Sequence, residues 1–108
     1  MSIKVRVGSV DNLIETQEVP NPDFCKIDVE GLEINVLRGM KRTLNEQRPT
    51  LFIEIHGADM PAKTANIRQV GKFLLDSGYQ IYHVESEQNL SSNTIDIARE
   101  GHIYCTPS

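Results

Sequence analysis

The sequence contains little of what marks membrane, secreted and metal-binding proteins. No run of apolar residues approaches the ~18 that cross a membrane, and residues 1–4 lack the apolar core of a signal peptide. The two cysteines, Cys25 and Cys105, lie far apart and do not have the spacing of metal ligands. We therefore expect a cytoplasmic protein with no membrane partner, whose cysteines are reduced core thiols rather than a disulfide.

Basic residues do not indicate a nucleic-acid partner. The net charge is −4, whereas phosphate binding needs clustered lysines and arginines. Lys41, Arg42 and Arg48 do gather near the end of a predicted helix, where positive charges stabilise the helix dipole. We interpret them as helix-stabilising residues, with phosphate binding as the weaker alternative.

The rest of the composition is typical of one globular α/β domain over residues 1–108. Apolar residues make up 39% of the chain and charged residues 24%, which favours a folded core over disorder. Short apolar or alternating segments predict strands at 3–7, 24–29, 50–56, 79–84 and 101–105. Helical turns and helical periodicity predict helices at 9–14, 32–47 and 64–77.

The order of these elements predicts a mostly parallel, Rossmann-like sheet with helices packed on it. Strand–helix–strand connections force parallel pairing through right-handed crossovers. Gly78 is placed to end the helix at 64–77 in the left-handed conformation. Polar loops are predicted at 57–63 and 85–100, with a short turn near 94–98 in the second. Because no helix precedes the last strand, we expect it to be antiparallel and at the sheet edge.

Acidic side chains follow two of the predicted buried strands. Asp28 and Glu30 end the first, and Glu54 and His56 end the second. Since ligands bind beyond the carboxyl ends of parallel strands, these four residues are candidates for acid–base chemistry. As a generic pattern, Asp28 and Glu30 are more often acids that stabilise the start of the helix that follows them.

The second pair of candidates also has structural alternatives. A carboxylate inside an apolar strand is costly unless paired, so Glu54 is either functional or ion-paired with a nearby lysine or arginine. His56 alone is more often a surface residue, and we treat His83 and His102 as structural. By residue type, Asp28, Glu54 and His56 also suit a metal-dependent enzyme, although their spacing does not require a metal and none is assigned.

Two longer blocks resemble the signature of FkbM-type methyltransferases. The first is Lys-Ile-Asp-Val-Glu-Gly-Leu-Glu at 26–33, followed by Val-Leu-Arg-Gly-Met at 36–40. The second is Arg-Pro-Thr-Leu-Phe-Ile-Glu-Ile-His at 48–56, and residues 7–13 are similar to a short element that precedes the signature. The resemblance extends from about residue 5 to residue 105.

The resemblance implies an S-adenosylmethionine-dependent enzyme that methylates hydroxyls of sugars or other small metabolites. It places Asp28, Glu30 and Glu54 at strand ends that face cofactor and acceptor. Asp28 or Glu30 would hold the acceptor hydroxyl or take its proton.

The resemblance covers only the C-terminal half of that fold. The family's glycine-rich cofactor loop has no counterpart in this sequence, so we expect the chain alone not to hold S-adenosylmethionine. A half sheet exposes apolar surface, which predicts a homodimer or a separate N-terminal half as partner. A non-enzymatic dimerisation or interaction module is the alternative function.

Overall fold

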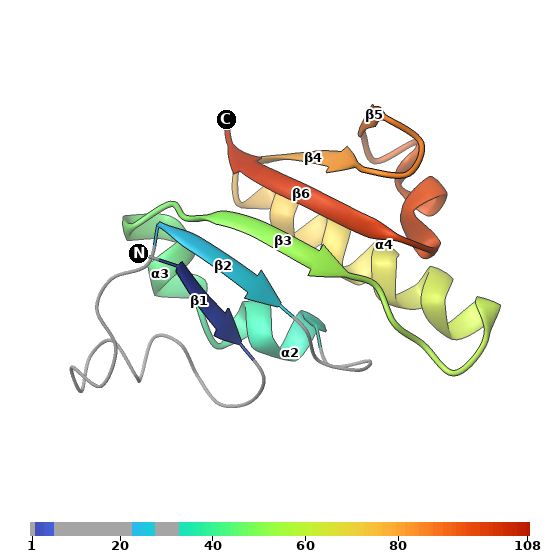
Figure 1. Ribbon diagram of the computed structural model, residues 1–108, viewed down its shortest axis with the longest axis horizontal. Coiled ribbons are helices and arrows are strands. Elements are labelled where there is room, and N and C mark those ends of the chain that lie inside the picture. The colour runs from blue at the N-terminus through green and yellow to red at the C-terminus, as the bar shows by residue number, and fades with distance from the viewer. Residues whose placement is uncertain (1, 6–22, 28–32) are drawn as a thin grey trace.

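The computed structural model describes residues 2–5, 23–27 and 33–108, which form a six-stranded sheet with helices (Figure 1). The elements in chain order are β1 (Ser2–Val5), β2 (Phe24–Ile27), α2 (Glu33–Arg38), α3 (Lys41–Glu46), β3 (Thr50–Glu54), α4 (Met60–Asp76), β4 (Tyr79–His83), β5 (Gln88–Leu90), the 3-10 helix η1 (Ile95–Arg99) and β6 (His102–Pro107). The predicted α/β class is confirmed. The turn predicted at 9–14 lies outside the described residues.

The sheet is mixed, and the prediction of a mostly parallel sheet is wrong. Its strand order is β1-β2-β3-β6-β4-β5. Among the described strands, β1–β2 and β2–β3 pair in parallel, whereas β3–β6, β6–β4 and β4–β5 pair antiparallel. The antiparallel pairs arise because the chain after β4 turns back on itself twice without a crossover helix.

The last strand, β6, is antiparallel as predicted, but its predicted place at the sheet edge is wrong. It lies between β3 and β4, and its inward side chains, Ile103 and Cys105, are fully buried. The edge is taken by β5, a short strand that the polar sequence at 85–100 did not indicate. Gln88 and Asn89 of β5 are exposed, so the solvent-exposed edge of the sheet is formed by a polar strand.

The two faces of the sheet have different surroundings. Cys25, Leu51, Cys105, Ile81 and Leu90 form one cross-strand row, and all five side chains are buried. Helices α2, α3 and α4 lie together on one face of the sheet in Figure 1. The helices therefore cover the apolar face, and the core lies between them and the sheet.

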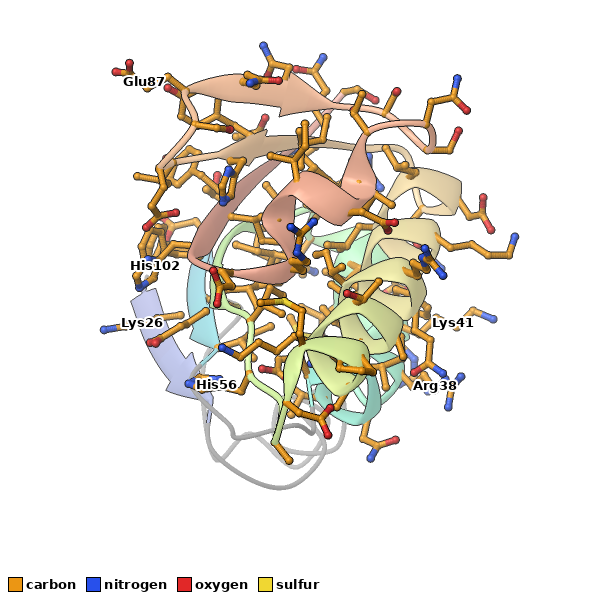
Figure 2. The ribbon with its side chains drawn as sticks, turned by 90° about the vertical axis from the view of Figure 1, so that its right-hand side faces the viewer. Lys26, Arg38, Lys41, His56, Glu87 and His102 are labelled. Atoms are coloured by element: carbon orange, nitrogen blue, oxygen red, sulfur yellow. The ribbon has the colours of Figure 1, made fainter. Side chains whose placement is uncertain are left out.

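The opposite sheet face carries a row of large polar and aromatic side chains. This free sheet face has the cross-strand row Lys26, Phe52, Tyr104, Tyr82 and Asn89, all of them exposed or half-buried. Figure 2 shows Lys26 on the side of the molecule opposite Arg38 and Lys41, which project from the helices. No helix of the described part of the chain covers this face.

The single helix predicted at 32–47 is two helices, α2 and α3. The break lies at Gly39 and Met40, where Met40 takes non-helical backbone angles and its amide bonds to the carbonyl of Leu37. The Met40 side chain is fully buried, so the turn between the helices is held by core packing. Lys41 and Arg42 consequently lie at the start of α3, and their predicted dipole-stabilising place at a helix end is wrong.

Arg48 does have the predicted role at a helix end. Its guanidinium donates to the carbonyl oxygens of Ser77 at 2.7 Å and Gly78 at 3.0 Å, and at 3.4 Å to Leu44 in α3. It also stacks over the Tyr79 ring, 4.9 Å from the ring centroid. Gly78 has φ +80, which confirms the predicted left-handed end of α4.

Helix α4 begins earlier than predicted, at Met60 rather than near residue 64. The Asp59 carboxylate accepts a hydrogen bond from the Ala62 amide at 2.9 Å, and Pro61 follows in the first turn. Both are standard signals of a helix start. The capping carboxylate accepts a hydrogen bond from a first-turn amide that has no partner within the helix, and proline has no amide hydrogen that would need a partner.

Both cysteines are free and buried, as predicted. Burial raises the pKa of the Cys25 thiol to about 12 and raises the pKa of Cys105 further. In the described part of the chain, no helix combines the length and apolar character needed to cross a membrane.

Candidate functional site

The predicted site residues that the structure describes meet at the carboxyl end of β3. Glu54 ends this strand and His56 follows it, with His56 Nε2 3.6 Å from Glu54 Oε1. Asp28 and Glu30 lie outside the described residues, so their place in the site stays a prediction. The Glu54 side chain is 47% exposed, which makes the expectation of a buried carboxylate wrong. Among the described residues, it lies near two histidines, and no lysine or arginine forms the ion pair that was the structural alternative for it.

His56 is held by a fully buried carboxylate, that of Glu33. Glu33 Oε1 lies 3.0 Å from both the backbone amide and the ring Nδ1 of His56. An ionised carboxylate only accepts hydrogen bonds, so this geometry places a hydrogen on Nδ1. The unprotonated Nε2 of a neutral ring then faces Glu54 and serves as a proton acceptor.

Asn66 of α4 completes the hydrogen bonding of this pair. Its side-chain amide donates to Glu33 Oε2 at 2.8 Å and to the His56 carbonyl at 2.9 Å. The buried carboxylate thus has three donors, which offset the cost of taking it out of water. The ring orientation of His56 is consequently fixed by residues from α2 and α4.

A second histidine approaches the other oxygen of Glu54. His102 pairs with Glu54 across the β3–β6 ladder, and its Nε2 lies 3.7 Å from Glu54 Oε2. Its ring stacks on Phe52 with centroids 5.3 Å apart. Figure 2 shows His56 and His102 on the same side of the molecule.

The carboxylate of Glu85 holds His102 in the way that Glu33 holds His56. Glu85 accepts from the His102 backbone amide and from ring Nδ1, each at 2.7 Å. These two bonds lower the pKa of the Glu85 carboxyl to about 2. Two glutamate–histidine pairs, Glu33–His56 and Glu85–His102, therefore present their Nε2 atoms to one shared carboxylate.

The third histidine, His83, is structural, as predicted. It is 5% exposed, and its ring bonds to the Ser86 hydroxyl at 2.7 Å and the Glu100 carbonyl at 2.8 Å. Its Nε2 also lies 3.5 Å from Glu85.

A cavity of about 470 Å³ opens beside the first pair. It is lined by Glu54, Ile55, His56, Gly57, Ala58, Lys63, Glu100 and Gly101. Among the described residues of this lining, Lys63 is the one lysine or arginine, and its ammonium group lies 3.5 Å from Glu100. The cavity can accept a small polar molecule whose hydroxyl reaches His56.

The described residues form no metal site. No group of three or more histidine, cysteine or acidic side chains in residues 2–5, 23–27 and 33–108 is arranged to hold a metal ion. Glu54 and His56 do meet, but the third residue of that hypothesis, Asp28, lies outside the described part.

Sequence reasoning did not single out Glu33, Asn66 or Glu85, and it treated His102 as structural. Glu33 stands inside the block that carried the family resemblance, and Asn66 lies among the apolar positions Ile67, Val70 and Leu74 of α4. A polar side chain on a buried helix face needs a partner, so Asn66 was a readable signal. Nothing in the sequence signals the pairing of Glu85 with His102.

Comparison with known proteins tests the family resemblance seen in the sequence. The family described as the methyltransferase FkbM domain matches residues 2–81. The chain belongs to this family. The resemblance noted from residues 26–40 and 48–56 is thereby confirmed.

Hexuronic acid methyltransferase AglP of Haloferax volcanii is 35% identical to the chain over 71 residues. The alignment covers 66% of this chain and 29% of AglP, so the FkbM-family chain matches less than a third of that protein's length. No solved structure matches the chain.

The family implies S-adenosylmethionine as methyl donor, and the described residues do not fit that whole molecule. The nucleoside of S-adenosylmethionine needs a flat apolar slot. The described residues of the cavity lining include no aromatic ring, and Ile55 is the one large apolar side chain among them. The polar side chains of the described lining come from Glu54, His56, Lys63 and Glu100.

Proposed function

We propose that this chain forms the acceptor side of an S-adenosylmethionine-dependent O-methyltransferase, in which His56 takes the proton of the acceptor hydroxyl. The observation that carries the proposal is the Glu33–His56 pair at the cavity. His56 is 20% exposed, and its Nδ1 is occupied by Glu33. With the hydrogen on Nδ1, the basic atom of the neutral ring is Nε2.

Glu33 and Glu54 act on His56 at different moments. Glu33 fixes the ring before the reaction, as the carboxylate does in a serine-protease triad. When the hydroxyl proton moves to Nε2, the ring becomes a cation and the hydroxyl oxygen keeps the electron pair. Glu54, 3.6 Å away, stabilises that cation. S-adenosylmethionine, when bound, supplies the methyl group that this oxygen receives.

Two observations, one from the cavity and one from the relative, support an acceptor class. The lining includes polar side chains from Glu54, His56, Lys63 and Glu100, and the name of AglP states that it is a hexuronic acid methyltransferase. Lys63 in the lining suits a carboxylate on such a sugar. We propose a sugar or related small metabolite as acceptor, with Asp28 and Glu30 as further hydroxyl-binding residues.

In this proposal, most of the cofactor is bound by a second part of the methyltransferase, which corresponds to the portion of AglP that this chain does not match. The incomplete fit of the cavity to a nucleoside supports a site divided between two parts. So does the lack of a glycine-rich cofactor loop in the sequence. The complementary part would be supplied by another segment or by another polypeptide.

Two titrations of the full 108-residue chain test the proposal. Calorimetry with S-adenosylmethionine is expected to show no micromolar binding, whereas NMR with a methyl hexuronide is expected to shift signals around His56. His56→Gln should reduce the second effect, and Lys72→Gln, on the exposed face of α4, should not. Tight cofactor binding would contradict the acceptor-side account, and absence of both bindings would favour an interaction module.

A non-enzymatic dimerisation module is the second candidate, and the free sheet face favours it. Phe52, Tyr82 and Tyr104 lie in one row on that face, and Tyr104 is 41% exposed. Parallel strands are normally covered on both faces, whereas the described helices cover β2 and β3 on one face. We propose that a second copy packs on this face. Analytical ultracentrifugation should show a dimer that Tyr104→Glu dissociates, while Lys72→Gln leaves it intact.

A further inference from the structure

We propose that Lys63 selects acceptors that carry a carboxylate, and that Glu100 occupies the place of this carboxylate until the acceptor displaces it. The two side chains together then determine the charge of the acceptors that the cavity binds. This inference deepens the proposed function and rests on it, because it takes the cavity beside His56 as the acceptor site.

The two charges reach the cavity from different elements. Lys63 lies in the first turn of α4, Glu100 lies between η1 and β6, and both line the cavity of about 470 Å³. Lys63 Nζ and Glu100 Oε1 are 3.5 Å apart. A direct hydrogen bond between an ammonium and a carboxylate is about 2.8 Å long. A ligand carboxylate at that shorter distance therefore binds Lys63 more strongly than Glu100 does.

The two side chains also differ in their contact with water. The Lys63 side chain is 30% exposed, whereas the Glu100 side chain is 62% exposed. A carboxylate this exposed gains little from an ion pair, so Glu100 can turn into water at small cost. Lys63 is the more buried partner and needs an anion close by to offset its lost hydration. The exchange that this difference favours is the replacement of Glu100 by a ligand anion.

The packing of Lys63 keeps it in place during this exchange. Its backbone amide donates to the Asp59 carbonyl at 3.0 Å. Gly57 lies directly against it, since a Cβ at residue 57 would be 2.7 Å from the Lys63 nitrogen and 2.9 Å from its Cγ. The start of the Lys63 side chain thus packs on Gly57, another residue of the cavity lining. A cation held in this way costs little further ordering when a ligand binds it.

Glu100 and a ligand carboxylate compete for one cation. Lys63 is the one lysine or arginine among the described residues of the lining. Two carboxylates beside a single ammonium repel each other, so the ligand carboxylate binds when Glu100 withdraws. Removal of Lys63 and removal of Glu100 should therefore change the binding of an anionic acceptor in opposite directions. A pair that only stabilises the fold does not predict opposite effects.

NMR titration of the full chain with two ligands tests the inference. One is the methyl hexuronide, and the other is the matching methyl hexoside, which has a hydroxymethyl group in place of the carboxylate. Lys63→Met keeps the packing on Gly57 without the charge, and it should weaken binding of the hexuronide about tenfold. Glu100→Gln removes the competitor and should tighten that binding about threefold. Wild type and both variants should bind the hexoside equally.

Lys72 and Asp76 provide the matched controls. They form an ion pair 3.0 Å long on the same helix, and neither is among the described residues of the cavity lining. Lys72→Met and Asp76→Asn remove the same two charges from the chain as the cavity variants do. Both control variants should bind the hexuronide and the hexoside as wild type does.

The inference is overturned if Lys63→Met and Glu100→Gln change hexuronide binding in the same direction or not at all. It is also overturned if they affect the hexoside to the same extent, or if the control variants reproduce their effects. In each of these cases, hexuronide-induced shifts around His56 would still support the proposed function. If neither ligand binds the wild-type chain, the inference and the proposed function both fail.

Discussion

At the scale of single residues, the site depends on two carboxylates that each hold a histidine by its amide and its Nδ1. Glu33 and Glu85 make the same pair of contacts, one from a buried position and one at 46% exposure. Glu54 and His56 were predicted from the rule that strand ends carry ligands. Glu33 and Glu85 were not predicted. Glu33 contacts a histidine 23 residues away in the sequence and Glu85 one 17 residues away, and a sequence alone does not show such long-range contacts.

Gly101 allows the Glu85–His102 contact to form. It has φ +98, and a Cβ there would collide with the Glu85 carboxylate and lie 3.1 Å from His83 Nε2. Gly101→Ala should therefore lower the free energy of unfolding by about 1 kcal/mol or more and displace Glu85 from His102. Urea unfolding measures the first effect and the NMR signal of the His102 amide the second. An unchanged stability and an unchanged amide signal would refute this role.

The same carboxylate makes stability depend on pH. The pKa of Glu85 is lowered to about 2 by its bonds to His102. A carboxyl with a lowered folded-state pKa stabilises the fold fully above its ordinary pKa of 4.5, and this contribution is lost as pH falls towards 2. For a pair this exposed, we expect less than about 1 kcal/mol.

Urea unfolding at several pH values checks the prediction for Glu85. Glu85→Gln should be less stable than wild type at pH 6 and lose less stability on acidification. Glu87→Gln, on the same turn, serves as control and should follow the wild-type curve. Equal pH dependence of all three proteins would contradict the assignment.

At the scale of elements, helix starts follow local chemistry, while helix breaks and strand partners follow packing. The sequence contains the start signals of α4, Asp59 and Pro61. The break between α2 and α3 could not be derived from periodicity, since Met40 keeps its place in the apolar stripe while its backbone leaves the helix. Strand β5 is polar and exists because it pairs with β4.

The cap of α4 gives a prediction at this scale. Asp59→Ala leaves the Ala62 amide without its carboxylate and should lower the free energy of unfolding by about 1 kcal/mol. Asp59→Asn should restore most of that loss, because asparagine also caps. Thermal and urea unfolding of both variants measure this. Equal loss in the two variants would indicate that charge, and not the cap, is what matters.

At the scale of the whole molecule, the position of β6 explains both the core and the site. By entering between β3 and β4, it buries Ile103 and Cys105 and brings His102 beside Glu54. The sequence predicted its antiparallel direction from the missing crossover helix. Its position was not predictable, because an edge strand and an inserted strand have the same local pattern.

The burial of the cysteines offers a test of this arrangement. Cys25 and Cys105 lie on either side of Leu51 in one cross-strand row and are fully buried, and burial raises the pKa of both thiols. Both thiols should resist iodoacetamide at pH 8 in the native chain and react once guanidinium unfolds it. Mass spectrometry counts the modified residues. Rapid labelling of Cys105 in the native protein would place β6 outside the core.

The central claim is that Glu33 makes His56 a base whose Nε2 faces the cavity. A long-range hydrogen–nitrogen NMR spectrum of the histidine rings, recorded at alkaline pH, tests it most directly. The account predicts that the His56 ring hydrogen resides on Nδ1 in wild type and that Glu33→Gln removes this preference. A hydrogen on Nε2 of His56 in the wild-type chain would contradict it.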